Sequence, residues 1–251
     1  MSSATTLRAL HVPGTPLVVP NAWDAASAHL IEEAGFAAVA TSSNATAAVL
    51  GYDDGEHAPV DEVLAAAARI VRAVSVPVTV DFERGYRLPP AELVERFLAT
   101  GAVGLNLEDS DPATGTMADP AEQADFLAAV RAAAGDALVI NARIDTFIRK
   151  AGTAGEQLRT AIDRGTRYLA AGADCVYPIA VGDLDVIGTL TGQLVGPVNV
   201  AYGMGANSVA DYAKRGVARI SFGPMFQRHL YGVFAGSVLP ALLADRNPFS
   251  R

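Results

Sequence analysis

The sequence is poor in cysteine, in aromatic residues and in long apolar runs. Its single cysteine, Cys175, excludes a disulfide within the chain and suits a reducing compartment, so we expect a cytoplasmic protein. There is no uninterrupted run of about 18 apolar residues, so no membrane span is expected. Residues 1–13 do not place an apolar run behind a basic cluster, as a signal peptide would.

Positive charge is also scarce, and this limits the possible partners. The 19 Lys and Arg residues face 27 Asp and Glu residues, so the net charge is −8 and the surface should repel phosphate backbones. We therefore expect no nucleic-acid partner. Only 7% of the residues are aromatic in a chain that is 51% apolar. Small aliphatic side chains must then fill the core, which favours close packing of helices on a sheet.

Short β-rich runs alternate with segments of helical period along the whole chain. Strands are expected at residues 17–20, 36–41, 76–82, 103–107, 138–142, 174–177, 198–202 and 218–222. Helices are expected at residues 25–34, 60–74, 89–100, 121–133, 155–171, 184–190 and 208–214, with a last helix running to about residue 243.

This order predicts the fold class. Eight β-then-α units in 251 residues favour an α/β protein built as one (β/α)8 TIM-type barrel, with residues 1–251 forming a single domain. Several strands are apolar throughout, as parallel strands covered on both faces are. A doubly wound open sheet is the alternative architecture.

Acidic and amide side chains gather where the predicted strands end. Asp81 and Glu83 follow the third strand, Glu108 and Asp109 follow the fourth, and the fifth leads into the segment 141–145. In a barrel these ends meet on one face, where barrel enzymes have their sites, and Asp81 and Glu83 can share a face. Carboxylates brought together repel unless a cation neutralises them. Oxygen donors alone indicate Mg2+, with Mn2+ as the alternative.

Other polar residues at the strand ends are candidate substrate ligands. Arg143 is the natural two-pronged partner for a substrate carboxylate. Thr41, Ser42 and Ser43 end the second strand and could bind other substrate oxygens, although this segment could equally be a turn. We expect Asp145 to cap a loop. Of the adjacent pair at 108–109, one acid is expected to act in the site and the other to support it.

Eight segments resemble, in order, the isocitrate lyase/phosphoenolpyruvate mutase superfamily. They span residues 20–224 and read PNAWDAASAHLIEEAGF, TSSNATAAVLGYDDGE, VPVTVDFERGY, VGLNLEDS, INARIDTF, GADCVYP, NVAYGMG and GVARISFGP. Each segment is weak by itself, but the ordered set is specific to the superfamily. It does not distinguish one activity from another within it.

The resemblance implies a role for each matching residue. Asp81 would hold Mg2+, partly through water, with Glu83 and Glu108 as further acids around the metal. Arg143 would bind the substrate carboxylate, and Asp54 matches an aspartate on a mobile loop beside the substrate. The catalytic set would then be Asp54, Arg143 and Glu108.

The remaining implications concern substrate binding and assembly. Ser42 and Ser43 would grip substrate oxygens through N–H and hydroxyl groups, and Asn199 matches a seventh-strand asparagine of the lyases. Thr41 and Arg143 complete the expected substrate-binding set. The resemblance also implies a homotetramer, with the last helix packing on a neighbouring chain.

Departures from the family pattern bear on the reaction. The lyases carry a Lys-Lys/Arg-Cys-Gly-His run after the fourth strand, but residues 109–117 contain no cysteine, histidine or lysine. The mutases' motif with lysine and asparagine is missing too. Ile179 stands where lyases have glutamate and mutases histidine.

The expected function is a Mg2+-dependent carbon–carbon lyase or decarboxylase. It would act on a small 2-oxo or 2-hydroxy di- or tricarboxylate through an enolate. One alternative is a phosphonopyruvate hydrolase-like or phosphoenolpyruvate mutase-like enzyme of C–P chemistry with Asp54 as nucleophile. The other is a barrel that binds a keto acid without turnover.

Overall fold

The computed structural model describes residues 3–150, 152–203 and 207–249. Its strands are β1 (Leu17–Val19), β2 (Asn21–Ala22), β3 (Val39–Thr41), β4 (Val78–Asp81), β5 (Gly104–Glu108), β6 (Val139–Ile144), β7 (Cys175–Pro178), β8 (Asn199–Ala201) and β9 (Arg219–Ser221). These strands pair in parallel, in the orders β2-β3-β4-β5-β6-β7 and β1-β9-β8.

Two short links close the two strand sets into one barrel. A parallel bridge between Val176 and Val198 joins β7 to β8. Only Pro20 separates β1 from β2, and a proline cannot donate to a ladder, so these two segments act as one interrupted strand. With β1 and β2 counted as one strand, the described chain forms a closed ring of eight parallel strands. This confirms the predicted barrel and excludes the open sheet.

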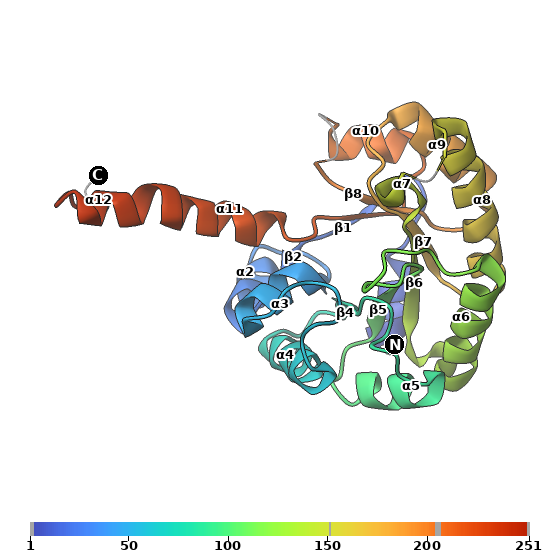
Figure 1. Cartoon of the computed structure of the whole chain (residues 1–251), viewed down its shortest axis with the longest axis horizontal. Coiled ribbons are helices and arrows are strands. Elements are labelled where there is room, and N and C mark those ends of the chain that lie inside the picture. Colours follow the sequence, from blue (N-terminus) through green and yellow to red (C-terminus); the bar gives the residue numbers. More distant parts are fainter. Residues whose placement is uncertain (1–2, 151, 204–206, 250–251) are drawn as a thin grey trace.

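Helices lie around this barrel, except that the last ones extend away from it (Figure 1). They are α1 (Ser3–Ala9), α2 (Ala25–Glu33), α3 (Ser43–Leu50), α4 (Val60–Ala73), α5 (Pro90–Leu98), α6 (Pro120–Ala134), α7 (Thr146–Arg149), α8 (Ala154–Ala170), α9 (Leu184–Gln193), α10 (Val209–Lys214), α11 (Met225–Val233) and α12 (Leu239–Leu243). The short helices α1, α3 and α7 were not predicted. Ser42 caps α3 by accepting from the Ala45 N–H, so residues 42–44 begin a helix and are not a plain turn.

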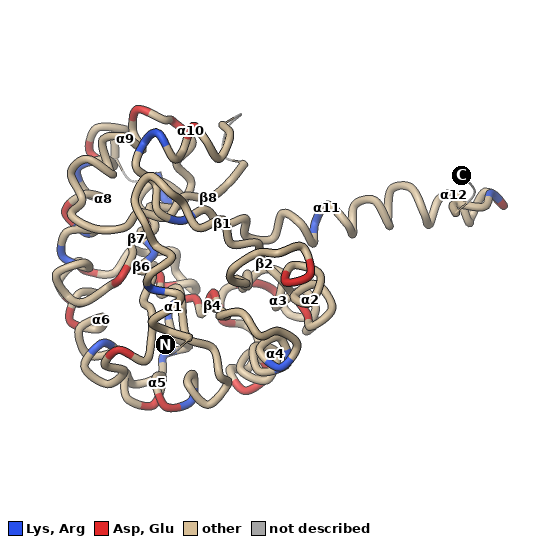
Figure 2. Tube along the Cα trace, turned by 180° about the vertical axis from the view of Figure 1, so that it is seen from behind, with Lys and Arg blue, Asp and Glu red and all other residues tan. Residues whose placement is uncertain are grey.

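The last helical segment leaves the barrel. A π-helical stretch, Phe234–Val238, joins α11 to α12, and together they extend away from the barrel as a rod (Figure 1). The predicted end at about residue 243 is confirmed. No Lys, Arg, Asp or Glu occurs between residues 229 and 244, and Figure 2 shows this stretch without a coloured charge. We call residues 225–243 the C-terminal arm.

The barrel interior is closed by apolar side chains at the amino ends of the strands and also contains polar groups. At the amino ends of the strands, Leu7 of α1 is buried against Leu17, Val19 and Val139. The interior also contains buried polar side chains, and these are Thr79, Asn106, Asn141, Asn199 and Arg219. None of the helices in the described ranges has the length and apolar character that crossing a membrane requires.

Candidate active site

Two adjoining cavities at the carboxyl ends of the strands contain most of the predicted site residues. Their volumes are about 210 and 230 Å³, and both are lined by Ser43, Asp54, Arg143 and Ile148. The first is lined also by Ser42, Asn44, Asp81, Asn106, Tyr177, Ile179 and Arg228. The second is lined also by Glu83 and Glu108. Three larger cavities in the described chain, of about 320, 360 and 430 Å³, are lined by none of the predicted site residues.

Asp81 is held from several directions at the end of β4. Its Oδ2 accepts hydrogen bonds from the Ser43 N–H at 3.0 Å and the Ser43 hydroxyl at 2.9 Å. Ser43 is the first residue of α3, and a helix amino terminus favours a carboxylate. The Asp81 backbone N–H donates to Thr41 Oγ1 at 3.1 Å. Thr41 lines neither cavity, and its hydroxyl supports Asp81. Its substrate contact stays a prediction.

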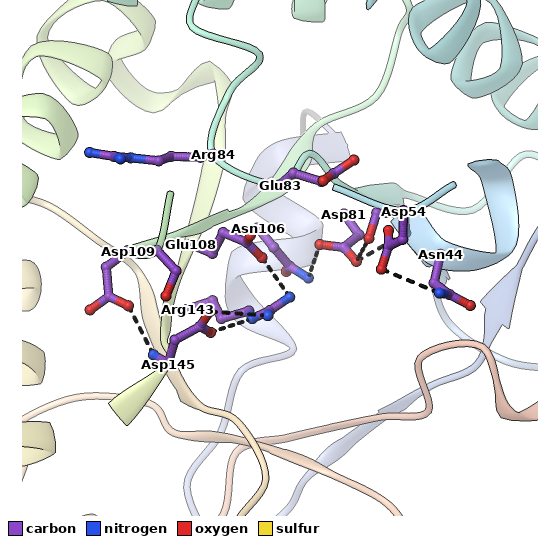
Figure 3. A network of polar contacts seen from close by, with 12 residues as sticks. Asn44, Asp54, Asp81, Glu83, Arg84, Asn106, Glu108, Asp109, Arg143 and Asp145 are labelled. Atoms are coloured by element: carbon purple, nitrogen blue, oxygen red, sulfur yellow. Dashed lines mark hydrogen bonds and ion pairs between the residues drawn. The ribbon is translucent and has the colours of Figure 1, made fainter. Parts of the chain in front are cut away.

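Arg143 is fixed by two buried carboxylates (Figure 3). Its Nε and Nη2 donate to Asp145 at 2.7 and 3.3 Å, and its Nη1 lies 2.6 Å from Glu108 Oε2. Glu108 and Arg143 are direct partners in the β5–β6 register, which explains their contact. A guanidinium has five N–H groups, so three contacts leave two for a ligand.

Asp145 therefore orients Arg143, and the prediction that it caps a loop was wrong. It stands at the start of α7 but makes no side-chain cap hydrogen bond. Its backbone N–H donates to Asp109 at 2.9 Å, and Asp109 also accepts from Arg164 and Tyr168. Asp109 is thus the supporting acid of the 108–109 pair, and Glu108 faces the cavity.

Burial and neighbouring carboxylates raise the pKa values of the two cavity glutamates. Burial raises the pKa of Glu108 to about 8, with the charges of Asp145, Asp81 and Glu83 adding to the effect and Arg143 opposing it. Burial likewise raises the pKa of Glu83 to about 7, aided by Asp81 and Asp54. A bound cation would reverse this bias, since it favours the ionised form of every acid around it.

The structure does not draw the three predicted metal ligands together at one point. Glu83 accepts a hydrogen bond from the Tyr86 hydroxyl at 2.8 Å and one from the Glu56 N–H at 2.7 Å. No side-chain hydrogen bond joins it to Asp81 or Glu108 (Figure 3). No group of three His, Cys, Asp or Glu side chains in the described residues is arranged to hold a metal ion. The donors are nevertheless hard oxygens that face cavities large enough for water, which fits Mg2+ with few protein ligands.

Asn199 is the predicted substrate ligand that the structure places away from the cavities. It is fully buried and pairs with Ser221 at 3.2 Å. It is the first residue of β8, so its side chain lies lower in the barrel than residues at the carboxyl ends. A sequence match locates a residue on a strand, whereas its height in the barrel depends on the stagger of the strands.

Sequence reasoning missed a polar chain at the first cavity that begins on the C-terminal arm. Arg228 Nη2 donates to Asn44 Oδ1 at 3.0 Å, and Asn44 Nδ2 donates to Asp54 Oδ2 at 3.3 Å. Arg228 and Asn44 are 184 residues apart. No local pattern marks such a pair, because a surface helix commonly carries an arginine.

The loop that differs from the lyases is a compact turn. Asp111 accepts from the N–H groups of Ala113 at 2.8 Å and Thr114 at 3.1 Å, and an antiparallel bridge joins Ser110 to Met117. Of this loop, Pro112 lines the second cavity. Among the described residues that line the two cavities there is no cysteine, lysine or histidine.

The fold and these strand-end residues define a class of enzyme. The family model for phosphoenolpyruvate phosphomutase matches residues 7–239, so the chain belongs to the phosphoenolpyruvate mutase/isocitrate lyase superfamily. Members similar to this chain include lyases, hydrolases and mutases.

Individual relatives are similar along most of the chain. An uncharacterised Mycobacterium tuberculosis protein is 34% identical over 96% of this chain and 90% of its own. The 2-methylisocitrate lyase of Escherichia coli is 31% identical over 73% of this chain and 64% of its own. A phosphonomutase-like protein of Burkholderia cenocepacia is 39% identical, covers 94% of this chain and 98% of its own, and superposes with a TM-score of 0.90.

Proposed function

We propose that the protein is a Mg2+-dependent lyase or decarboxylase for a small 2-oxo or 2-hydroxy di- or tricarboxylate, acting through an enolate. The observation that carries this proposal is Arg143, held by Glu108 and Asp145 and lining the same cavity as Asp81. An immobilised guanidinium beside hard oxygen donors can fix a carboxylate next to the carbon that reacts.

Asp81 would hold the Mg2+, with Glu108 and Glu83 acting through water. A bound Mg2+ supplies positive charge where the oxyanion develops. Ser43 fixes Asp81 before a ligand arrives, so little reorganisation is required. A phosphonopyruvate hydrolase of the same fold contains oxalate and Mg2+, and oxalate has the planar shape of a pyruvate enolate.

The first cavity favours a doubly charged substrate. Arg143 and Arg228 both line it, so one carboxylate can meet each arginine. Ile148 and Ile179 are apolar members of its lining. A volume of about 210 Å³ limits the substrate to a small acid, since cavities for drug-sized ligands begin at roughly 300 Å³.

The composition of the 109–117 loop favours decarboxylation. Carbon–carbon cleavage of a 2-hydroxy acid leaves a carbanion on the departing fragment, which a nearby acid must protonate. When a 2-oxo diacid loses as CO2 the carboxylate that is beta to its keto group, the bonding electrons form an enolate on the fragment held by Arg143, and CO2 departs without a proton. Asp54, held by Asn44, would then carry a proton to the enolate. An oxaloacetate decarboxylase of Rhodopseudomonas palustris is 31% identical over 68% of this chain and 61% of its own.

The test is a substrate panel with Mg2+: oxaloacetate, 2-methylisocitrate, isocitrate, citramalate and phosphonopyruvate. We expect pyruvate and CO2 from oxaloacetate above the rate with Mg2+ alone. Phosphate release from phosphonopyruvate would favour the C–P alternative. Binding of a keto acid at micromolar concentration without turnover of any compound would favour the non-catalytic barrel.

Variants then test the assignment of residues. Asp81→Ala should abolish the metal-dependent rate, and an unchanged rate would refute the metal site. Asp54→Asn should lower the rate at least tenfold if it carries the proton, as general acid–base groups contribute about 10²-fold or more. Asp53→Asn is the matched control, because this exposed neighbour lines neither cavity.

We also propose that the chain is a homo-oligomer assembled through the C-terminal arm. Leu230, Phe234 and Leu243 of the arm are 54, 54 and 90% exposed. A groove of about 430 Å³ lies at its base, with Trp23, Leu30 and other mostly apolar residues as lining. Apolar surface of this extent indicates a protein partner, and a second copy of the chain is the partner that the superfamily implies.

A further inference from the structure

A buried arginine lies in the barrel interior without a carboxylate partner. Arg219, on β9, is 1% exposed, and no acid among the described residues is within ion-pair distance. Its Nε and Nη1 have no hydrogen-bond partner in the described chain. Cys175, Tyr177 and Asp81 are near enough to interact with its charge. The function proposed above makes no use of this residue.

Such an arginine should weaken the fold. A guanidinium stays charged in a protein interior, and an uncompensated buried charge is costly. Replacing buried charged groups by apolar groups of similar volume is often neutral or stabilising. Arg164 provides the contrast, because it is similarly buried but pairs with Asp109 at 3.0 Å. A residue that lowers stability calls for another physical role.

The contacts of Arg219 lead to Asn106, on the floor of the first cavity. Arg219 Nη2 donates to Asn106 Oδ1 at 3.5 Å, and Asn141 Nδ2 donates to the same oxygen at 2.8 Å. Asn106 Nδ2 in turn donates to Asp81 Oδ1 at 3.4 Å. Asn106 is the register partner of both Asp81 and Asn141, so this stack follows from strand pairing.

These contacts allow Asn106 only one amide orientation. If the amide were flipped, its N–H groups would face the donors of Arg219 and Asn141, and its oxygen would face the Asp81 carboxylate. The observed orientation leaves an N–H donor towards Asp81 and the cavity, where Asn106 forms part of the lining. Asn141 contributes one of the two donors that set this orientation, and Arg219 contributes the charged one.

We propose that Arg219 is a positioning residue that acts through Asn106, fixing an amide donor on the cavity floor that holds Asp81 and meets an oxygen of the bound acid. This inference rests on the function proposed above. It assigns the substrate-side donor to Asn106 and makes the interior of the barrel part of the site.

The test is a double-mutant cycle with oxalate as the probe. Binding of oxalate in the presence of Mg2+ is measured by calorimetry for the unchanged protein, Arg219→Met, Asn106→Ala and the double variant. We expect Arg219→Met to weaken oxalate binding about tenfold and Asn106→Ala at least as much. In the Asn106→Ala background, Arg219→Met should change the Kd by less than about twofold, because coupled residues are not additive.

Thermal unfolding separates positioning from a purely structural role. Arg219→Met should leave the midpoint unchanged or raise it, whereas Arg164→Met, the matched control at a paired arginine, should lower it. A lower midpoint for Arg219→Met with oxalate binding intact would overturn the inference, as would a tenfold effect that persists in the Asn106→Ala background.

A second variant, Asn106→Asp, keeps the inference testable if Arg219→Met does not fold. Asn106→Asp keeps the shape and the arginine but replaces the amide donor by an acceptor, so it should weaken oxalate binding at least tenfold. Unchanged binding would overturn the inference. If the unchanged protein binds Mg2+ and oxalate but the cycle is additive, only the role of Arg219 fails. Absence of Mg2+-dependent oxalate binding in the unchanged protein would overturn the proposed function and this inference with it.

Discussion

Removal of the Asp145 side chain should destabilise the protein far more than the loss of a loop cap, which was the role expected from the sequence. The side chain is fully buried and makes two charge-assisted hydrogen bonds to Arg143, at 2.7 and 3.3 Å. Hydrogen bonds to charged groups contribute about 1.5–3 kcal/mol each. Breaking a buried ion pair costs about 3–5 kcal/mol, but Arg143 would keep Glu108 at 2.6 Å. We therefore expect a loss of about 3 kcal/mol for Asp145→Ala.

The assay is thermal unfolding at fixed protein concentration. For a chain of this size, about 3 kcal/mol corresponds to a fall in the midpoint of roughly 6–12 °C. Asp145→Asn keeps one acceptor oxygen and should lose about half as much. The matched control is Asp163→Ala, which removes an ion pair of 2.9 Å to Arg167 whose side chains are 53 and 50% exposed. Solvent screens that pair, so its midpoint should not move measurably.

The binding readout of the same variants is independent of stability. Burial lowers the pKa of Arg143, but the neighbouring carboxylates raise it by more. A guanidinium stays charged inside proteins in any case, so we expect Arg143 to be charged in these variants too. What Asp145→Ala removes is the orientation of Arg143, and oxalate binding should weaken with Mg2+ present. If Asp145→Ala and Asp163→Ala had equal midpoints of thermal unfolding, the idea that Asp145 supports the site would be refuted.

Three further predictions concern pH, the loop beside the site and assembly. Burial raises the pKa of Glu108 to about 8 and of Glu83 to about 7, so between about pH 5 and 8 the folded state keeps protons that the unfolded chain has lost. Without Mg2+ these two groups should therefore make the urea midpoint of unfolding fall as the pH rises through this range. A rise of the midpoint would contradict both raised pKa values. In the loop of residues 52–57, the Glu56 carboxylate accepts hydrogen bonds from the backbone N–H groups of residues 84 and 86 at 3.2 and 2.7 Å. Glu56→Ala should therefore speed backbone hydrogen exchange in residues 52–57 but not in the barrel strands. An unchanged exchange rate would show that this contact does not hold the loop. Leu230→Asp should reduce the oligomer mass in sedimentation whereas Val195→Asp, at an exposed valine outside the arm, should not, and equal masses would place the interface elsewhere.

The element order and the location of the site could be predicted from the sequence. Strand and helix types depend on local periodicity, since the faces that a segment buries recur every two or 3.6 residues. Asp81, Glu108 and Arg143 stand directly at strand ends, and parallel strands in a barrel bring those ends to one face. These three residues therefore reach the same region whatever the details of packing.

What the tertiary structure decided is the partner and the height of each side chain. Asp145 holds Arg143, Glu83 is engaged by Glu56 and Tyr86, and Asn199 lies below the cavities, because strand stagger and loop conformation depend on the whole barrel. The same holds for contacts between distant segments, such as Arg219 with Asn106, 113 residues away. Local sequence patterns carry no information on such pairs, since they form only when the barrel closes.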